Sequence, residues 1–199
     1  MNAALAAKVA YVALLIIGLL VFLGSHSVAI VAPDWRDRMA GKMGLAWRGI
    51  YSIISLIGFV LIIRGFAAAR LTPEVLYVPP SWMRHVTMTL MLPVFPLLLA
   101  TYLPGRIKTT MKHTMLVAIK LWAFAHLLAN GMLADVLLFG GFLFWAVIDR
   151  ISLKRRPVRV IPTLPAAGYN DWLAVIGGLA IYVVTLLWAH ARLIGIALI

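Results

Sequence analysis

Apolar positions along the chain form long unbroken runs, and polar positions gather in short segments between them. The apolar runs cover Val9–Ala32, Leu45–Ile63, Met83–Leu103, Thr114–Ile148 and Trp172–Ile199. A helix needs about 20 apolar residues to cross a bilayer, so each run is long enough for a transmembrane helix. The pattern predicts an all-α protein, a polytopic transmembrane helix bundle of five to six helices.

Two of the runs contain residues that interrupt a helix. Pro93 and Pro96 lie within the third run and predict a kink, because proline lacks the backbone N–H that a helix needs. The run Thr114–Ile148 is longer than one crossing and is interrupted by Asn130-Gly131. We therefore expect a helical hairpin over residues 114–148, with one or both segments short for a full span.

The remaining organisation is simple. No repeat or second domain is visible, so residues 1–199 are expected to form a single membrane domain. The first apolar run continues from Leu23 through Ser25–Ala32, which favours a retained transmembrane helix over a cleaved signal peptide. Leu71–Pro80 and Pro157–Gly168 are rich in proline, and we expect both to be non-helical loops.

Composition and charge support a lipid environment. The chain is 64% hydrophobic and 12% charged, with a formal charge of +12. Three inter-helix segments hold most of the basic residues, and the positive-inside rule places these segments in the cytoplasm and both termini outside. Their basic residues are Arg36, Arg38, Lys42, Arg48; Arg106, Lys108, Lys112; and Arg150, Lys154, Arg155, Arg156, Arg159. This charge suits anionic lipid headgroups, so we expect the bilayer and no nucleic acid as a partner.

The absence of cysteine limits the cofactor chemistry. The sequence contains no cysteine, which excludes disulfides, iron–sulfur clusters and thiolate-bound or thioether-attached haem. It also contains no HExxH, Walker or GxSxG motif and no pair of carboxylates suited to hydrolysis. Any metal would be held by histidine, methionine, tyrosine, carboxylate or carbonyl groups.

Two histidines lie inside apolar helices, where an imidazole is costly unless it has a partner. His26 lies about 9 Å from the cytoplasmic end of its helix, taking 1.5 Å per residue from Ala32. His126 lies at a similar depth of about 9 Å if Lys120 marks the headgroup level. Two imidazoles at one depth predict metal ligands, and bis-histidine haem b fits the lack of cysteine. The alternative is a pair of core histidines, each bonded to a backbone carbonyl or a serine.

Other polar residues bear on the predicted haem site. Trp122, His126 and Asn130 are spaced four residues apart, so on one helix they would share a face that suits either a cofactor pocket or a helix–helix contact. His113 lies 13 residues before His126 and would face nearly the opposite way, so the two cannot chelate one metal on a straight helix. For His85, His113 and His190, near helix ends, we favour interfacial anchoring.

Several motifs resemble those of the NnrU family of bacterial membrane proteins. They are "FLGSHS", "WRGIYSIISLIGF", "YLPGRIKTTMKHTM", "IKLWAFAHLLANG" and "LFGGFLFWAVIDRISLKRR", and the resemblance covers nearly the whole chain. It implies a multi-pass protein of the bacterial inner membrane with a role in nitrite and nitric oxide metabolism, beside respiratory or denitrification enzymes. A non-enzymatic assembly or transport helper without a cofactor is the alternative.

NnrU proteins are similar to zeta-carotene isomerase, a membrane haem b enzyme. This resemblance implies that His26 and His126 are the haem ligands. His113 corresponds to a histidine of an "RHP" motif, but this chain has "KHT" there, and the isomerase's further histidine falls near Phe144–Trp145. A remoter likeness to membrane methyltransferases would imply S-adenosylmethionine, although no glutamate follows Glu74.

Overall fold

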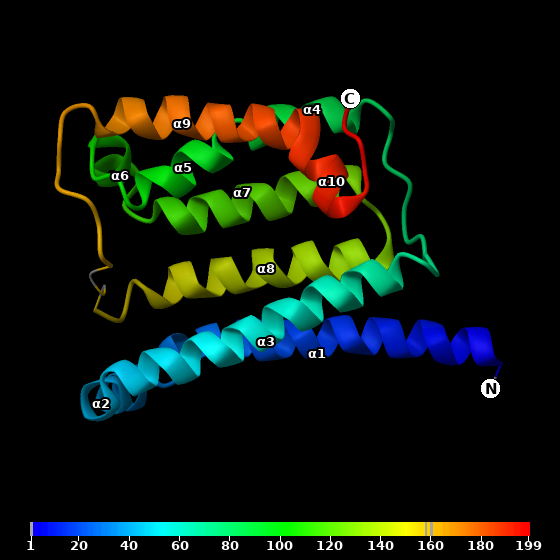
Figure 1. Ribbon diagram of the computed structural model, residues 1–199, viewed down its shortest axis with the longest axis horizontal. Coiled ribbons are helices and arrows are strands. Elements are labelled where there is room, and N and C mark those ends of the chain that lie inside the picture. Colours follow the sequence, from blue (N-terminus) through cyan, green and yellow to red (C-terminus); the bar gives the residue numbers. More distant parts are fainter. Residues whose placement is uncertain (1, 158, 160) are drawn as a thin grey trace. The chain divides into compact units, whose positions relative to one another are not determined.

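The computed structural model describes residues 2–157, 159 and 161–199, and these form helices joined by loops (Figure 1). The predicted all-α fold is confirmed. The helices are α1 (Ala3–Val31), α2 (Pro33–Met43), α3 (Leu45–Ala69), α4 (Met83–Met91), α5 (Val94–Ala100), α6 (Arg106–Met111), α7 (Thr114–Ala129), α8 (Leu133–Ser152), α9 (Asn170–Val184), the π-helix η1 (Thr185–Ala189) and α10 (His190–Ile194).

Within the described residues, four helical segments are long and apolar enough to cross a membrane. They are Ala3–Val31, Leu45–Ala69, Met83–Ala100 and Asn170–Ile194. Helix α7 is apolar but shorter, and α8 has 20 residues and includes Asp135, Asp149 and Arg150. Large apolar side chains on the long helices are exposed, such as Leu20 at 68% and Ile53 at 61%, as expected for helices whose solvent is lipid.

The prolines break the third apolar run as predicted. Helix α4 ends at Met91 and α5 begins at Val94, with Leu92 and Pro93 between them. Pro93 has no N–H to continue the ladder, but its carbonyl accepts a hydrogen bond from the N–H of Leu97 at 3.0 Å. Pro96 lies in the first turn of α5, where a missing N–H leaves no bond unmade.

Other helix bounds differ from the prediction. Helix α3 was expected to end at Arg64 but continues to Ala69, because Arg64 stays exposed while the next residue, Gly65, is buried against α1. Helix α2 occupies a segment expected to be a loop, and Pro33 starts it at a position that proline favours. The basic segment after α5 likewise contains the short helix α6. In the predicted loop 157–168, positions 158 and 160 lie outside the described residues, and the described ones are non-helical.

Contacts divide the chain into two compact units. The first unit comprises Met1–Pro79 and Asn130–Pro157, and the second comprises Pro80–Ala129 and Val158–Ile199. In the first, α1 packs along α3, and α8 packs against α1 and α3 (Figure 1). In the second, α5 packs against α7 and α9, and α4 against α7. The two segments of the predicted hairpin, α7 and α8, thus each pack within a different unit.

Helices α1 and α3 approach so closely that their backbones touch at three glycines. A Cβ at Gly18 would lie 2.6 Å from the backbone nitrogen of Ile62, and one at Gly58 would lie 2.6 Å from that of Phe22. At Gly65 the nearest atom would be the nitrogen of Leu15, at 2.4 Å. Small residues at such crossings let helices associate in lipid through van der Waals contact.

The Asn130-Gly131 break is confirmed, and a loop of the first unit fills it. The carbonyl of Gly131 accepts hydrogen bonds from the N–H groups of Leu76 at 2.8 Å and Tyr77 at 3.2 Å. The Tyr77 hydroxyl donates to the carbonyl of Asn130 at 2.7 Å. A Cβ on Gly131 would lie 1.9 Å from the Tyr77 carbonyl oxygen, so only glycine fits here.

Polar side chains fasten the "YLPGR" turn of the second unit. Asp171 accepts hydrogen bonds from the N–H groups of Arg106 at 2.8 Å and Ile107 at 3.1 Å, at the start of α6. The buried amide of Asn170 donates to the carbonyls of Pro104 at 2.8 Å and Pro165 at 3.0 Å. These bonds satisfy backbone groups that a proline-rich turn leaves without partners of its own.

Candidate functional site

His26 lies in α1 and is held by its Nδ1 atom. Nδ1 lies 2.7 Å from the carbonyl oxygen of Phe22, one turn earlier. A carbonyl oxygen only accepts, so Nδ1 carries the proton in this bond, and in the neutral ring Nε2 then keeps its lone pair. The Phe22 ring lies against the imidazole, with centroids 4.3 Å apart. The backbone bond and the ring contact together fix the orientation of His26.

The surroundings of His26 combine aromatic rings with hydroxyl groups. Tyr51 of α3 and Trp145 of α8 lie beside the imidazole, with ring centroids at 5.3 Å and 6.0 Å. The Ser25 hydroxyl lies 3.3 Å from that of Ser55, which joins α1 to α3. Trp145 Nε1 is buried and has no hydrogen-bond partner among the described residues. A buried indole N–H without an acceptor is uncommon in a folded protein, so an acceptor placed beside Nε1 of Trp145 would be stabilised.

The buried carboxylates of the first unit are satisfied within α8 and its flanks. Asp149 forms an ion pair with Arg156, and the Arg156 Nε donates to the Ser152 hydroxyl at 3.0 Å. Asp135 accepts a hydrogen bond from the N–H of Met132 at 3.1 Å and so caps the start of α8. Both carboxylates therefore have structural partners.

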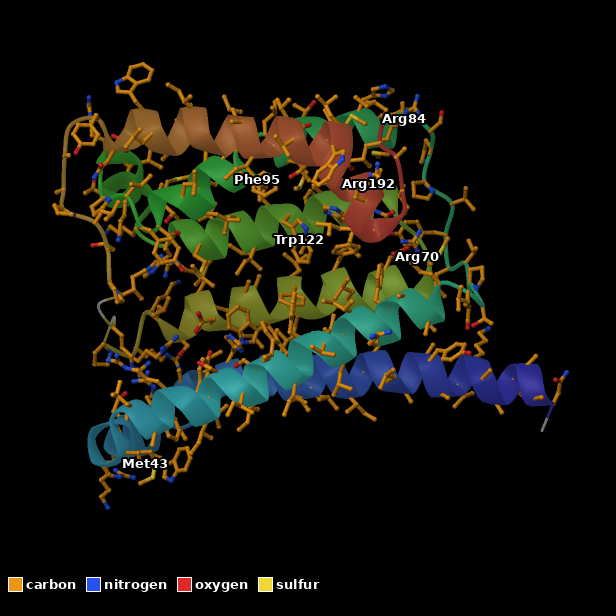
Figure 2. All side chains as sticks on the ribbon, in the orientation of Figure 1. Met43, Arg70, Arg84, Phe95, Trp122 and Arg192 are labelled. Carbon is orange, nitrogen blue, oxygen red and sulfur yellow. The ribbon has the colours of Figure 1, made fainter. Side chains whose placement is uncertain are left out.

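His126 lies in α7 and is held in the same way as His26. Its Nδ1 atom lies 2.8 Å from the carbonyl oxygen of Trp122, and the two rings are 5.5 Å apart (Trp122 is labelled in Figure 2). The preceding residue, Ala125, is fully buried, and its carbonyl accepts a hydrogen bond from the Thr87 hydroxyl at 2.8 Å. The predicted pairing of Trp122 with His126 on one helix face is confirmed.

His190 belongs to the second unit, as His126 does. His190 Nδ1 lies 2.8 Å from the carbonyl oxygen of Ile196, and the residue directly follows the π-helix η1. Single π-helical turns inside α-helices occur frequently at functional sites. The π-helix is the feature that sequence periodicity did not reveal, because one extra residue in a turn changes which side chains share a face.

The remaining predicted residues lie elsewhere. His113 precedes α7, and its N–H donates to the Met111 carbonyl at 2.6 Å, so it lies near the opposite end of this helix from His126. Helix α7 ends at Ala129, so Asn130 lies one residue beyond the helix, and its place on the face of Trp122 and His126 stays a prediction. Asn130 instead belongs to the first unit, where its carbonyl binds Tyr77.

The donor chemistry of His26 and His126 fits a haem iron. Metal-binding histidines characteristically donate one ring N–H to a carbonyl or carboxylate and ligate through the other nitrogen. At both residues Nδ1 is hydrogen-bonded to a backbone carbonyl, as expected for a core histidine. A histidine that ligates a metal through Nε2 would make the same bond with Nδ1. Within the described residues, no group of three or more His, Asp or Glu side chains gathers to hold a metal. Ligation of one iron by both residues stays a prediction.

Comparison with known proteins supports the resemblance in the sequence motifs. A family model described as NnrU protein matches residues 14–198. No curated protein and no solved structure matches the chain. Since the family model covers nearly all of the sequence and the structure contains apolar helices of membrane-spanning length, the protein is a membrane protein that belongs to the NnrU family.

Proposed function

We propose that this NnrU protein binds haem b through His26 and His126 and acts in nitrite and nitric oxide metabolism in the bacterial inner membrane. One observation carries the proposal. Both histidines donate Nδ1–H to the backbone carbonyl four residues earlier, at 2.7 Å and 2.8 Å, and both rings lie beside an aromatic side chain. This arrangement prepares Nε2 of each ring as a ligand.

The chain's own residues have defined tasks in this proposal. Phe22 and Trp122 restrict ring rotation and supply the accepting carbonyls, so each imidazole is held in one tautomer. The buried Trp145 N–H near His26 would donate to a polar group at the edge of the macrocycle. When bound, haem b would supply one-electron chemistry and an iron centre that binds nitric oxide.

The experiment is an absorbance spectrum of the full chain purified from haem-replete cells, oxidised and reduced. We expect a Soret band with low-spin, bis-imidazole character. His26→Ala and His126→Ala should each alter or remove the band, because each would remove one of the two imidazoles that hold the iron. His85→Ala is the matched control, since His85 is exposed near the start of α4, and it should leave the spectrum unchanged. Added imidazole should restore the band in the two ligand variants.

Two outcomes would reject this proposal. A colourless protein from haem-replete cells would reject haem binding, and a Soret band unaffected by both substitutions would reject His26 and His126 as the ligands. If the protein is colourless, a His26/His126 double variant with a normal growth phenotype under nitrite would support the helper function instead. That function predicts co-purification with respiratory or denitrification enzymes and no dependence on either imidazole.

A further inference from the structure

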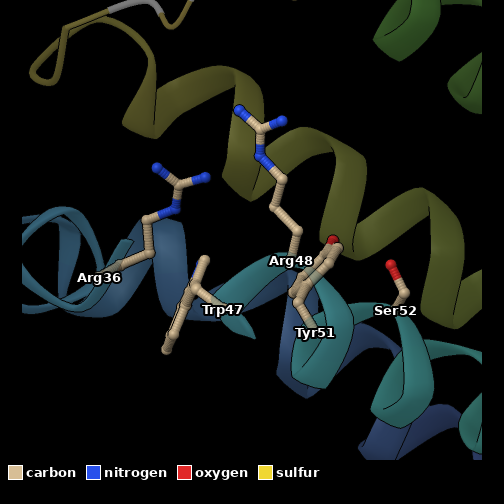
Figure 3. Close-up of a pocket in the computed structure, with 5 residues that line it drawn as sticks. All are labelled: Arg36, Trp47, Arg48, Tyr51 and Ser52. Atoms are coloured by element: carbon tan, nitrogen blue, oxygen red, sulfur yellow. The ribbon is translucent and has the colours of Figure 1, made fainter. Parts of the chain in front are cut away.

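A hollow of about 290 Å³ lies where α2 meets the start of α3 (Figure 3). Its lining is made by the side chains of Arg36 from α2 and of Trp47, Arg48, Tyr51 and Ser52 from α3. Figure 3 shows both guanidinium groups extending to the same side of the two helices. Two planar guanidinium groups beside aromatic side chains are an arrangement that binds phosphate or carboxylate oxygens.

The positive charge of this hollow is only partly neutralised. Arg36 donates to Asp37 at 2.8 Å, but that carboxylate is half-exposed. Arg48 makes no side-chain hydrogen bond or ion pair within the part of the chain that the structure describes. The Ser52 hydroxyl adds a third donor to the rim. An anion entering the hollow would therefore meet cationic donors that the protein itself does not satisfy.

The position of the hollow indicates where its anion comes from. It lies at the end of two long apolar helices, α1 and α3, and the polar helix α2 joins them. Trp35 and Trp47 lie beside it, with ring centroids 5.6 Å apart, and tryptophan is enriched at the headgroup level of membranes. Val31 and Leu45, which flank α2, are 82% and 80% exposed, as expected next to acyl chains.

We propose that this hollow binds the phosphate of an anionic phospholipid headgroup. Arg36 and Arg48 pair with the phosphate oxygens, the Ser52 hydroxyl donates a hydrogen bond, and Trp47 and Tyr51 form the wall. The acyl chains extend along the exposed apolar surfaces of α1 and α3. Binding here does not depend on haem, so the inference goes beyond the function proposed above.

The test measures lipid retention by native mass spectrometry of the full chain in detergent, with phosphatidylglycerol or phosphatidylcholine added at equal concentration. We expect preferential retention of phosphatidylglycerol. Arg48→Gln should weaken that retention about fivefold, because one basic residue near a membrane surface contributes about 1 kcal/mol to binding anionic lipid. Arg48→Lys should lose less, since it keeps the charge and loses only the two-pronged geometry.

Arg64→Gln is the matched control. Arg64 is an exposed arginine of the same helix, outside the hollow, and its substitution should leave phosphatidylglycerol retention unchanged. An equal loss in Arg64→Gln and Arg48→Gln would overturn the proposal, because it would mean non-specific surface charge. Displacement of the lipid by millimolar inorganic phosphate would identify free phosphate as the ligand and would also overturn it. Loss of a Soret band in Arg48→Gln with lipid retention intact would assign the hollow to a haem carboxylate instead.

Discussion

The two units of this protein hold their helices together in different ways. In the first, α1 and α3 touch backbone to backbone through Gly18, Gly58 and Gly65. In the second, hydroxyl and amide side chains join the helices, as with Thr87 to the Ala125 carbonyl and Tyr182 to the Met88 carbonyl, beside close glycine contacts at Gly105 and Gly178. Lipid provides no hydrophobic drive for helix association, so close packing and interhelical hydrogen bonds are the two means available. Close backbone packing predominates in the first unit, and interhelical hydrogen bonds predominate in the second.

The glycine contacts predict that the α1–α3 pair is sensitive to an added methyl group. Gly65→Ala would place a Cβ 2.4 Å from the Leu15 backbone nitrogen, where no flexible side chain can move aside. We expect a destabilisation of about 3 kcal/mol, the upper range for overpacking, measured by titrating the purified protein with a denaturing detergent. Gly49→Ala, on the same helix, is the control, because a Cβ at Gly49 meets nothing within 4 Å. Equal stability of the two variants would contradict the glycine contact.

In the second unit we expect a clear effect on stability at Asn170. Asn170→Ala removes both hydrogen bonds of a buried amide and leaves the carbonyls of Pro104 and Pro165 without these donors. Such a change costs about 2 kcal/mol, and the same detergent titration would measure it. Asn170→Asp keeps the shape and removes the donors, so it should be at least as unstable. A stable aspartate variant would show that shape, and not hydrogen bonding, fixes the "YLPGR" turn.

A smaller effect is expected where one hydroxyl joins two helices. Tyr182→Phe removes the 3.0 Å bond from α9 to the Met88 carbonyl and should cost about 1 kcal/mol. Tyr169→Phe is the control, because the Tyr169 side chain is 64% exposed and its loss of a hydroxyl should change stability by less than about 0.5 kcal/mol. Indistinguishable variants would mean that this hydrogen bond adds nothing to the second unit.

The sequence predicted those parts of the fold that depend on local chemistry. Proline at position 93 and Asn130-Gly131 break helices whatever surrounds them, and both breaks are present. The extension of α3 beyond Arg64 was not predicted, because it depends on Gly65 meeting a helix 50 residues earlier in the chain. The sequence predicts a loop where α2 lies, because the segment is rich in charged residues and lacks an apolar run, whereas the structure has a regular helix that begins at Pro33.

For the candidate site, too, the sequence predicted the features that depend on local helical spacing. The spacing of Trp122 and His126 correctly indicated a shared helix face, and their rings lie 5.5 Å apart. Asn130 lies just beyond the end of α7, so its place on that face stays a prediction. For His190 the sequence predicts interfacial anchoring, and the π-helical turn directly before this residue leaves no mark in the apolar pattern.

The first unit is discontinuous along the chain, and this has a consequence for biosynthesis. A ribosome delivers the N-terminus first, so α1 and α3 can associate early, whereas α8 emerges only after residues 80–129. Until then the loop at Leu76 and Tyr77 has no Gly131 carbonyl to accept its N–H groups. The first unit therefore stays incomplete in the bilayer until the intervening helices and α8 have been inserted.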